Sequence, residues 1–225
     1  MVDGALPPQE SPQVAARLAG LGLDWSSQLW VAIREGERAR RTATDTEPTS
    51  AGGLKDWIAR VGRLREKLGD EGWKPVNNYQ IPIAVNPAKT IGVGVLLGDH
   101  ATAGPDPGPL SKYPKGPKVL EVAARNRTLF SPAEAGRPDL MDDHEYSRLS
   151  TWFLVTYRQV IPRCGNDPAR ALIVSELSLP GGTAGENGGF PQVWLDRIIL
   201  PASEFPIKRE PFDGDEDIPD LFEGM

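Results

Sequence analysis

The spacing of apolar residues changes near residue 70, and this change constrains the fold more strongly than any other feature of the chain. Before it, apolar residues recur every three or four positions in segments that begin near residues 12, 25 and 54, which predicts amphipathic helices. After it, residues 79–86 and 90–98 alternate apolar side chains as strands do, and the intervening "NPAK" suits a hairpin turn. The chain therefore predicts helices first and a sheet afterwards.

The second half of the chain predicts two further strands and two further helices. Residues 169–180 and 190–201 have strand patterns and predict a second antiparallel hairpin. Residues 119–130 and 144–161 predict helices, the second largely buried and ended by Pro162. Because strict alternation of strand and helix is missing, we expect an α+β fold, with an antiparallel sheet built from two hairpins and packed with several amphipathic helices.

We expect four segments along the chain. They are a flexible leader over residues 1–12, a helical segment over 13–69 that packs on the body, an α+β domain over 73–205 and an acidic disordered tail over 206–225. The chain has no run of about 18 apolar residues, which a membrane-spanning helix requires. Its first residues lack the basic and apolar regions of a secretory signal. A single cysteine forbids an intrachain disulfide, so a cytoplasmic protein is expected.

The clearest helix pattern covers residues 54–73. One stripe of it is apolar and is expected to face the core: Leu54, Trp57, Ile58, Val61, Leu64 and Leu68. The opposite face is basic and is expected to face solvent: Lys55, Arg60, Arg63 and Lys67. A second basic cluster ends the preceding helix, where cations complement the helix dipole: Arg34, Arg38, Arg40 and Arg41.

Residues 92–118, "GVGVLLGDHATAGPDPGPLSKYPKGPK", begin like a phosphate-binding loop and end in lysines. The glycine spacing is not that of a dinucleotide-binding turn, and the Gly-Lys-Ser/Thr of a nucleotide-binding loop is absent. Instead, the glycines line one face of a strand and allow a helix or another backbone to approach closely. The long loop that follows offers three candidate anion-binding residues: Lys112, Lys115 and Lys118.

The net charge of −6 comes from the end of the chain. The last fourteen residues hold six of the 31 acidic residues and no base, so the rest of the chain has 25 acidic and 25 basic residues. A neutral body does not predict strong non-specific binding to nucleic acid. The segment "DGDEDIPDLF" resembles the acidic C-terminal tip of bacterial single-stranded-DNA-binding proteins, over about ten residues.

The resemblance of the tail has clear departures. Asp220 and Leu221 come between Pro219 and Phe222, and three residues follow Phe222. Nothing upstream resembles the oligonucleotide-binding barrel of that family. What carries over is an acidic strip with apolar anchors that docks in a basic, apolar groove of a partner protein. The candidate partner-binding residues are Asp215, Glu216, Asp217, Ile218, Leu221 and Phe222.

Few residues are available for catalysis. With two histidines, His100 and His144, and one cysteine, Cys164, neither a multi-histidine zinc site nor a structural zinc site can form. The best catalytic constellation is Asp99, His100, Glu176 and Asp196. If Glu176 and Asp196 share one face of paired strands, their carboxylates can hold Mg²⁺ for phosphoryl chemistry, although cross-strand ion pairs explain them more simply.

These observations favour a non-enzymatic protein without a cofactor. We expect an accessory or adaptor subunit of a bacterial multi-protein assembly, associated with nucleic-acid handling or defence, that docks its partner through the acidic tail. A metal-dependent hydrolase or nuclease that uses the clustered carboxylates is the alternative. A direct nucleic-acid-binding protein, which uses the loop lysines and the arginines of the early helices, is a second alternative.

Overall fold

The computed structural model describes most of the helical segment and the sheet. The described residues are 6–77, 81–112, 120, 123, 126, 149–165, 167–181, 190–191 and 193–207. The helices are α1 (Pro12–Gly20), the π-helical turn η1 (Trp25–Leu29), α2 (Trp30–Arg40) and α3 (Ala51–Gly69). The strands are β1 (Lys74–Val76), β2 (Ile83–Val85), β3 (Ile91–Leu97), β4 (Ser150–Ile161), β5 (Arg170–Gly181) and β6 (Val193–Pro206).

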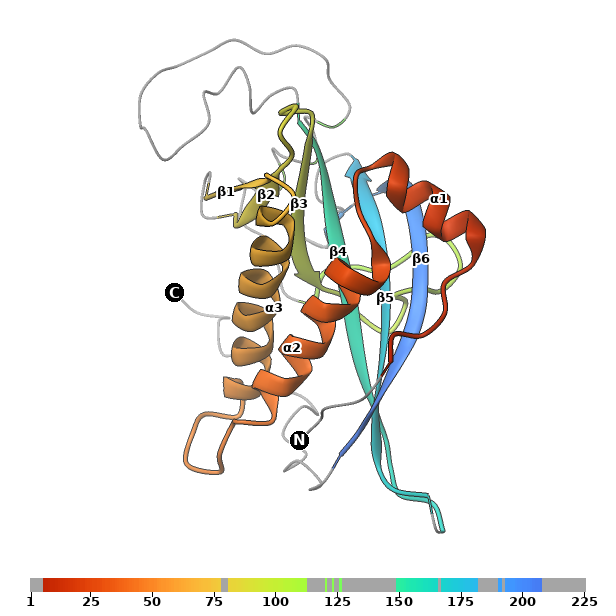
Figure 1. Cartoon of the computed structure of the whole chain (residues 1–225). Coiled ribbons are helices and arrows are strands. Elements are labelled where there is room, and N and C mark those ends of the chain that lie inside the picture. Colours follow the sequence, from red (N-terminus) through yellow and green to blue (C-terminus); the bar gives the residue numbers. More distant parts are fainter. Residues whose placement is uncertain are drawn as a thin grey trace, which may run out of the picture.

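The six strands form one sheet in which spatial order follows chain order, β1-β2-β3-β4-β5-β6. The pair β3–β4 is parallel and every other pair is antiparallel. The sheet therefore consists of two three-stranded antiparallel units joined by one parallel pair, with the helices on one face (Figure 1). An α+β fold with a mostly antiparallel sheet is confirmed, but two hairpins are too few to describe it.

The helix expected over residues 144–161 is wrong, because residues 150–161 form the central strand β4. Both faces of β4 are covered over its first half, where Thr151 to Thr156 are all buried. A strand buried on both sides has a continuous apolar run without alternation, and its period cannot be distinguished from that of a buried helix. The β-branched and aromatic residues of this run are the signal that favours a strand.

Two of the helical segments, α1 and η1, begin at a side-chain cap. Ser11 Oγ accepts the N–H of Val14 at the start of α1. Asp24 Oδ1 accepts from the N–H of Ser27 at 2.7 Å and from Ser26 Oγ at 3.0 Å at the start of η1. Partial burial raises the pKa of Asp24, but the hydrogen bonds from Ser27 and Ser26 together outweigh it, so this pKa lies below its ordinary value.

The buried face of α3 differs from the expected stripe. Val61, Leu64 and Leu68 are buried as expected, but Leu54 and Ile58 are 57% and 56% exposed. In their place, Arg60, which was expected to face solvent, is buried together with Asp56. The helix is rotated about its axis relative to the expectation because its buried face also packs against α2, where an ion pair takes the place of apolar contacts.

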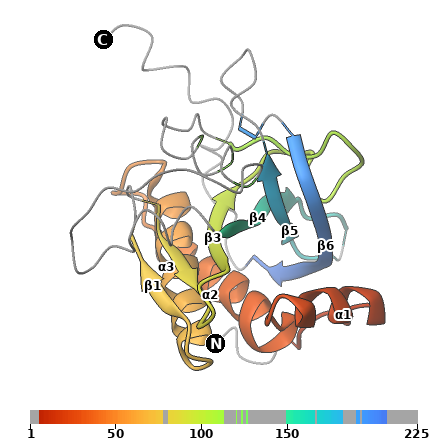
Figure 2. The ribbon, with the colours of Figure 1, turned by 90° about the horizontal axis from the view of Figure 1, so that it is seen from above.

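Each face of the sheet has its own apolar core. The helices lie against one face of the sheet (Figure 2). They share with this face the larger core, which includes Trp25, Trp30 and Leu154. The smaller core lies on the opposite face and includes Phe153 and Phe190, whose rings meet edge to face at 6.3 Å. Among the helices of the described residues, none has the length and apolarity that crossing a membrane requires.

The glycines of β3 face the smaller core, as their alternation with Val93 and Val95 predicts. The atoms nearest to these glycines belong to side chains, whereas a helix or another backbone was expected there. A Cβ added to Gly94 would lie 2.9 Å from the ring of Phe153 and 3.3 Å from Ile83. The glycine therefore makes room for side chains of the two neighbouring strands, which bring this part of the smaller core against the sheet.

Candidate functional site

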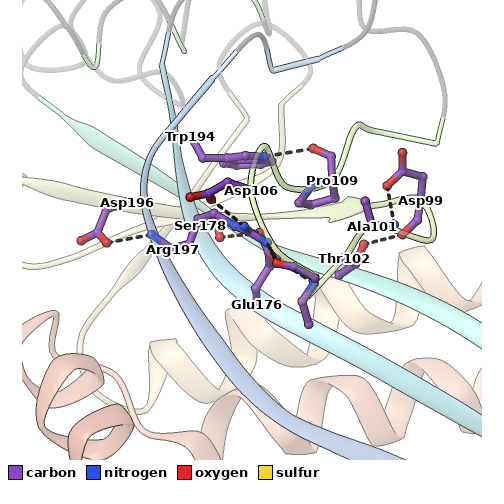
Figure 3. A network of polar contacts seen from close by, with 12 residues as sticks. Asp99, Ala101, Thr102, Asp106, Pro109, Glu176, Ser178, Trp194, Asp196 and Arg197 are labelled. Atoms are coloured by element: carbon purple, nitrogen blue, oxygen red, sulfur yellow. Dashed lines mark hydrogen bonds and ion pairs between the residues drawn. The ribbon is translucent and has the colours of Figure 1, made fainter.

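Glu176, one of the predicted catalytic carboxylates, is completely buried on the sheet face opposite the helices. Its Oε1 accepts from Ser178 Oγ at 2.7 Å and Arg197 Nε at 3.1 Å. Its Oε2 accepts from the N–H of Ala103 at 2.8 Å and Arg197 Nη2 at 2.6 Å (Figure 3). The hydrogen bond with Glu176 raises the pKa of Arg197 above its ordinary value. Both carboxylate oxygens thus already have two donors each.

Arg197 connects this carboxylate to the loop that follows β3. It donates to the carbonyl oxygen of Gly104 at 3.0 Å and to Asp106 Oδ1 at 3.2 Å. Nearby, Trp194 Nε1 donates to the carbonyl oxygen of Pro109 at 2.9 Å. We call Glu176, Ser178 and Arg197 the Glu176 clamp, because together they fasten the loop to the sheet. In this geometry the partner of the Glu176 carboxylate is Arg197, in a structural contact, rather than a metal ion.

Asp196 lies on the other face of the sheet, so the expectation that it shares a face with Glu176 is wrong. Glu176 pairs with Ile199, whereas Asp196 pairs with Leu179, an offset of three positions. Since side chains alternate between faces, an odd offset separates the two carboxylates. Asp196 Oδ1 instead accepts from Arg17 Nη2 of α1 at 2.5 Å, and Figure 3 shows Asp196 pointing away from Glu176.

The other two predicted catalytic residues lie at the start of the loop after β3. Asp99 Oδ1 accepts the N–H of Ala101 at 3.1 Å in a local turn, and His100 is exposed. Within the described ranges, no group of three or more histidine, cysteine or acidic residues is arranged to hold a metal ion. The four predicted residues therefore do not converge on one point.

The remaining predicted residues are only partly covered by the structure. Lys112 is described and exposed. The others lie outside the described residues: Lys115, Lys118, Asp215, Glu216, Asp217, Ile218, Leu221 and Phe222.

A second polar network, which sequence reasoning missed, is buried between the helices and the sheet. Arg60 Nη2 donates to Asp56 Oδ1 at 2.5 Å, and Arg60 Nη1 donates to Thr156 Oγ1 of β4. Both side chains of the Asp56–Arg60 pair are only 2% exposed. The only signal in the sequence is their i,i+4 spacing on α3, which is also common on exposed helix faces.

A glutamate of α2 joins the same region to β4. Glu37 Oε2 accepts from Arg158 Nε at 2.8 Å, and Glu37 Oε1 accepts from Arg41 Nε at 3.1 Å. The Glu37 side chain is 1% exposed, and burial of a carboxylate at this depth requires partners such as these. Arg158 and Thr156 project from the same face of β4, since they are two residues apart.

Beside this network lies a recess with a free volume of about 50 Å³, which is room for roughly four water-sized groups. We call it the cationic recess. Its charged and polar lining residues come from α2, α3, β4 and the segments flanking α3 and β3: Arg40, Ser50, Asp56, Arg60, Lys112, Thr156, Tyr157 and Arg158. Four of these are cations, and the one acid among them is held by Arg60.

The N-terminus of α3 also faces the cationic recess. Ser50 and Gly53 line it, Ser50 makes no side-chain capping bond, and the first turn of α3 has no acidic residue. Arg40 packs on this turn, since a Cβ added to Gly53 would lie 3.6 Å from Arg40 Nη1. A helix N-terminus carries a partial positive charge. An anion at this point would be attracted by both the guanidinium and the helix N-terminus.

Comparison with known proteins assigns the chain to no family. No family model matches the chain, and no curated protein and no solved structure matches it either.

Proposed function

We propose that the protein is a non-enzymatic binding subunit whose cationic recess takes up a phosphate group of its partner. The observation that carries the proposal is the convergence of Arg40, Arg60, Lys112 and Arg158, from four parts of the chain, on one recess. Beside the recess, Glu37 pairs with Arg41 and Arg158, and Asp56 pairs with Arg60. A phosphate group there would accept from guanidinium and ammonium donors in a partly dehydrated place.

Phosphate suits the recess better than a larger anion. The free volume of about 50 Å³ matches the oxygens of one phosphate group, at roughly one water-sized volume each. Guanidinium groups and the first N–H groups of a helix are the donors that bind phosphate oxygens in proteins. The recess offers both, through Arg40 and the first turn of α3.

The proposal keeps the role of an accessory subunit and draws on two residues of the direct-binding alternative. Arg40 and Lys112 belong to the basic residues that the sequence offered for contact with nucleic acid. The metal-dependent alternative has less support, since its carboxylates lie apart and Glu176 already has four hydrogen-bond donors. Docking of a partner by the acidic tail remains a separate hypothesis, because the tail lies outside the described residues.

Isothermal titration of the full chain with inorganic phosphate tests the proposal. The variant Arg40→Gln/Lys112→Gln should bind at least about tenfold more weakly, since a charge-assisted hydrogen bond contributes about 1.5–3 kcal/mol. The matched control is Arg63→Gln/Lys67→Gln on the outer face of α3, which removes the same charge from pairs with Glu66 and Asp70. The control should bind as the wild type does.

Two further ligands identify the source of the phosphate. Phosphoserine represents a phosphorylated protein, and a short single-stranded oligonucleotide represents nucleic acid. Whichever binds more tightly than inorganic phosphate, with the same loss in Arg40→Gln/Lys112→Gln, names the class of partner. Equal loss of binding in the recess variant and the control would mean that only the overall charge matters, and the proposal would be wrong.

A further inference from the structure

We propose that Glu176 and Arg197 are positioning residues for the cationic recess: from the opposite face of the sheet, they hold the loop that places Lys112 at the recess. The inference rests on the proposed function, and it adds a second set of residues on which phosphate binding depends. The loop covers residues 98–111, and we call it the clamp loop. Its first residue, Gly98, and the residue that follows it, Lys112, line the recess, whereas its middle is fastened by the Glu176 clamp.

The two ends of the clamp loop are joined beside the recess. The N–H of Lys112 donates to the carbonyl oxygen of Leu97 at 2.8 Å, and the N–H of Gly98 donates to the carbonyl oxygen of Thr156 at 2.9 Å. All four of these residues line the recess. Gly98 also forms an isolated bridge with Ser111. The backbone position of Lys112 therefore depends on how well the ends of the clamp loop stay together.

The clamp loop has little regular structure of its own to keep it closed. Its sequence, "GDHATAGPDPGPLS", contains three glycines and three prolines, and the prolines have no N–H to donate. Next to the bridge at its base, the N–H of Asp99 donates to the carbonyl oxygen of Leu110 at 3.0 Å. A two-stranded contact as short as this is marginal in water. Contacts from outside the loop therefore have to supply much of its stability.

The Glu176 clamp supplies such contacts to the middle of the loop. Glu176 Oε2 accepts the N–H of Ala103 at 2.8 Å. Arg197 donates to the carbonyl oxygen of Gly104 at 3.0 Å and to Asp106 Oδ1 at 3.2 Å (Figure 3). The Glu176 side chain is fully buried and that of Arg197 is mostly buried, and charge-assisted hydrogen bonds are strong in such a place. The clamp thus keeps the middle of the loop on the sheet and, through it, the two ends together.

A fixed backbone makes Lys112 a better phosphate donor. The lysine stem loses rotamer freedom when the ammonium group binds an anion. If the backbone also had to be ordered at that moment, binding would cost more, and ordering it in advance removes this cost. An ammonium group has three N–H donors, so a contact with another group leaves Lys112 able to donate to phosphate as well.

The coupling between the clamp and the recess works in both directions. Because a coupling free energy is reciprocal, phosphate must stabilise the closed clamp loop by the factor by which closure strengthens phosphate binding. The N–H of Ala103 reports opening of the loop, since it is bonded to Glu176 on the face opposite the recess. Phosphate should therefore slow hydrogen exchange at Ala103 in the wild type, and this slowing should be absent in Lys112→Gln.

A double-mutant cycle, measured by titration of the full chain with inorganic phosphate, tests the positioning role. Arg197→Lys keeps the charge beside Glu176 but loses the planar fork that reaches the clamp loop. It should weaken phosphate binding by about threefold to tenfold. In the Lys112→Gln background the same substitution should have no further effect, because the residue that it positions no longer carries a charge. Trp194→Phe, which removes the hydrogen bond to the carbonyl oxygen of Pro109, is a milder variant with the same expected dependence and serves if Arg197→Lys does not fold.

Arg65→Lys is the matched control. Arg65 also uses its guanidinium group to hold backbone carbonyl groups, those of Val76 and Ile83. It lies towards the C-terminal end of α3, whereas the recess lies at the N-terminal end of this helix. Arg65→Lys should therefore bind phosphate as the wild type does, although it makes the same chemical change at a similar kind of contact.

The outcomes separate the two proposals. Failure of the wild type to bind phosphate would overturn the proposed function and this inference with it. If the wild type binds phosphate, unchanged binding by Arg197→Lys or an equal loss in Arg65→Lys would overturn the inference alone. A loss from Arg197→Lys that persists in full in the Lys112→Gln background would do the same. Exchange at Ala103 that phosphate does not slow would also overturn it and leave the proposed function standing.

Discussion

Gly36 of α2 allows the two long helices to pack against each other, and replacing it with alanine tests the buried network directly. A Cβ added at Gly36 would overlap Asp56 Oδ1 and would lie 2.9 Å from Arg60 Nε and 3.1 Å from the carbonyl oxygen of Asp56. The last of these atoms belongs to the backbone and cannot rotate away. The extra methyl group therefore has to push the helices apart or displace the Asp56 side chain from Arg60.

The magnitude follows from three opposing effects. Alanine is favoured over glycine inside a helix by about 1 kcal/mol. Overpacking of a closely packed contact costs about 1–3 kcal/mol, and a buried charge that loses its partner costs about 3–5 kcal/mol. Since both unfavourable effects arise at Gly36, we expect Gly36→Ala to lower the free energy of unfolding by at least about 2 kcal/mol.

Gly62→Ala is the matched control, because Gly62 lies inside α3 and a Cβ added there would meet nothing within 4 Å. It should raise the free energy of unfolding by about 0.5–1 kcal/mol. Urea unfolding of both variants measures the two changes, provided that the slope with denaturant stays constant. If Gly36→Ala were as stabilising as Gly62→Ala, the close approach of α2 to the Asp56–Arg60 pair would be refuted.

Two further predictions concern the Glu176 clamp and the cap of η1. Glu176→Gln places an amide where Arg197 and the N–H of Ala103 need an acceptor. It should therefore lower the free energy of unfolding by about 3–5 kcal/mol and speed hydrogen exchange at Ala103. The control Asp196→Asn, at an exposed ion pair, should lower it by no more than about 1 kcal/mol. Asp24→Ala should cost about 1 kcal/mol at neutral pH. The pKa of Asp24 is lower in the folded protein than in the unfolded chain. The stability that Asp24 contributes is therefore fully present at pH values above its unfolded pKa, and it is lost as pH falls through its folded pKa. In unfolding measurements below the ordinary pKa of 3.8, the variant should approach the stability of the wild type.

The parts of the fold that the sequence predicts are those that depend on neighbouring residues. The helices expected from near residues 12 and 25 are found as α1 and as η1 with α2, and Ser11 and Asp24 cap their starts. The alternation of glycine with Val93 and Val95 gives β3 and its two faces. In these cases one segment carries the whole signal.

The buried charges illustrate what neighbouring residues cannot predict. A helix pattern places Leu54 and Ile58 inside and Arg60 outside, because apolar residues are normally buried. In the structure, Arg60 is buried because Asp56 precedes it by one turn, Thr156 lies across on β4, and Gly36 leaves space for both. Three separate segments have to come together before the burial of that arginine is favourable, and no single one of them indicates it.

Register decides which chemistry each face of the sheet can perform. Glu176 and Asp196 have the residue types of a metal site, but an odd offset between β5 and β6 places one in the clamp and the other beside Arg17. Such a one-residue difference in pairing moves every side chain of a strand to the other face. The same rule places Thr156 and Arg158 together under α2 and α3, on the face opposite Glu176. The sheet thus has a fastened loop on one side and a cation-lined recess on the other, which is why the recess, rather than the carboxylates, is the place to look for a ligand.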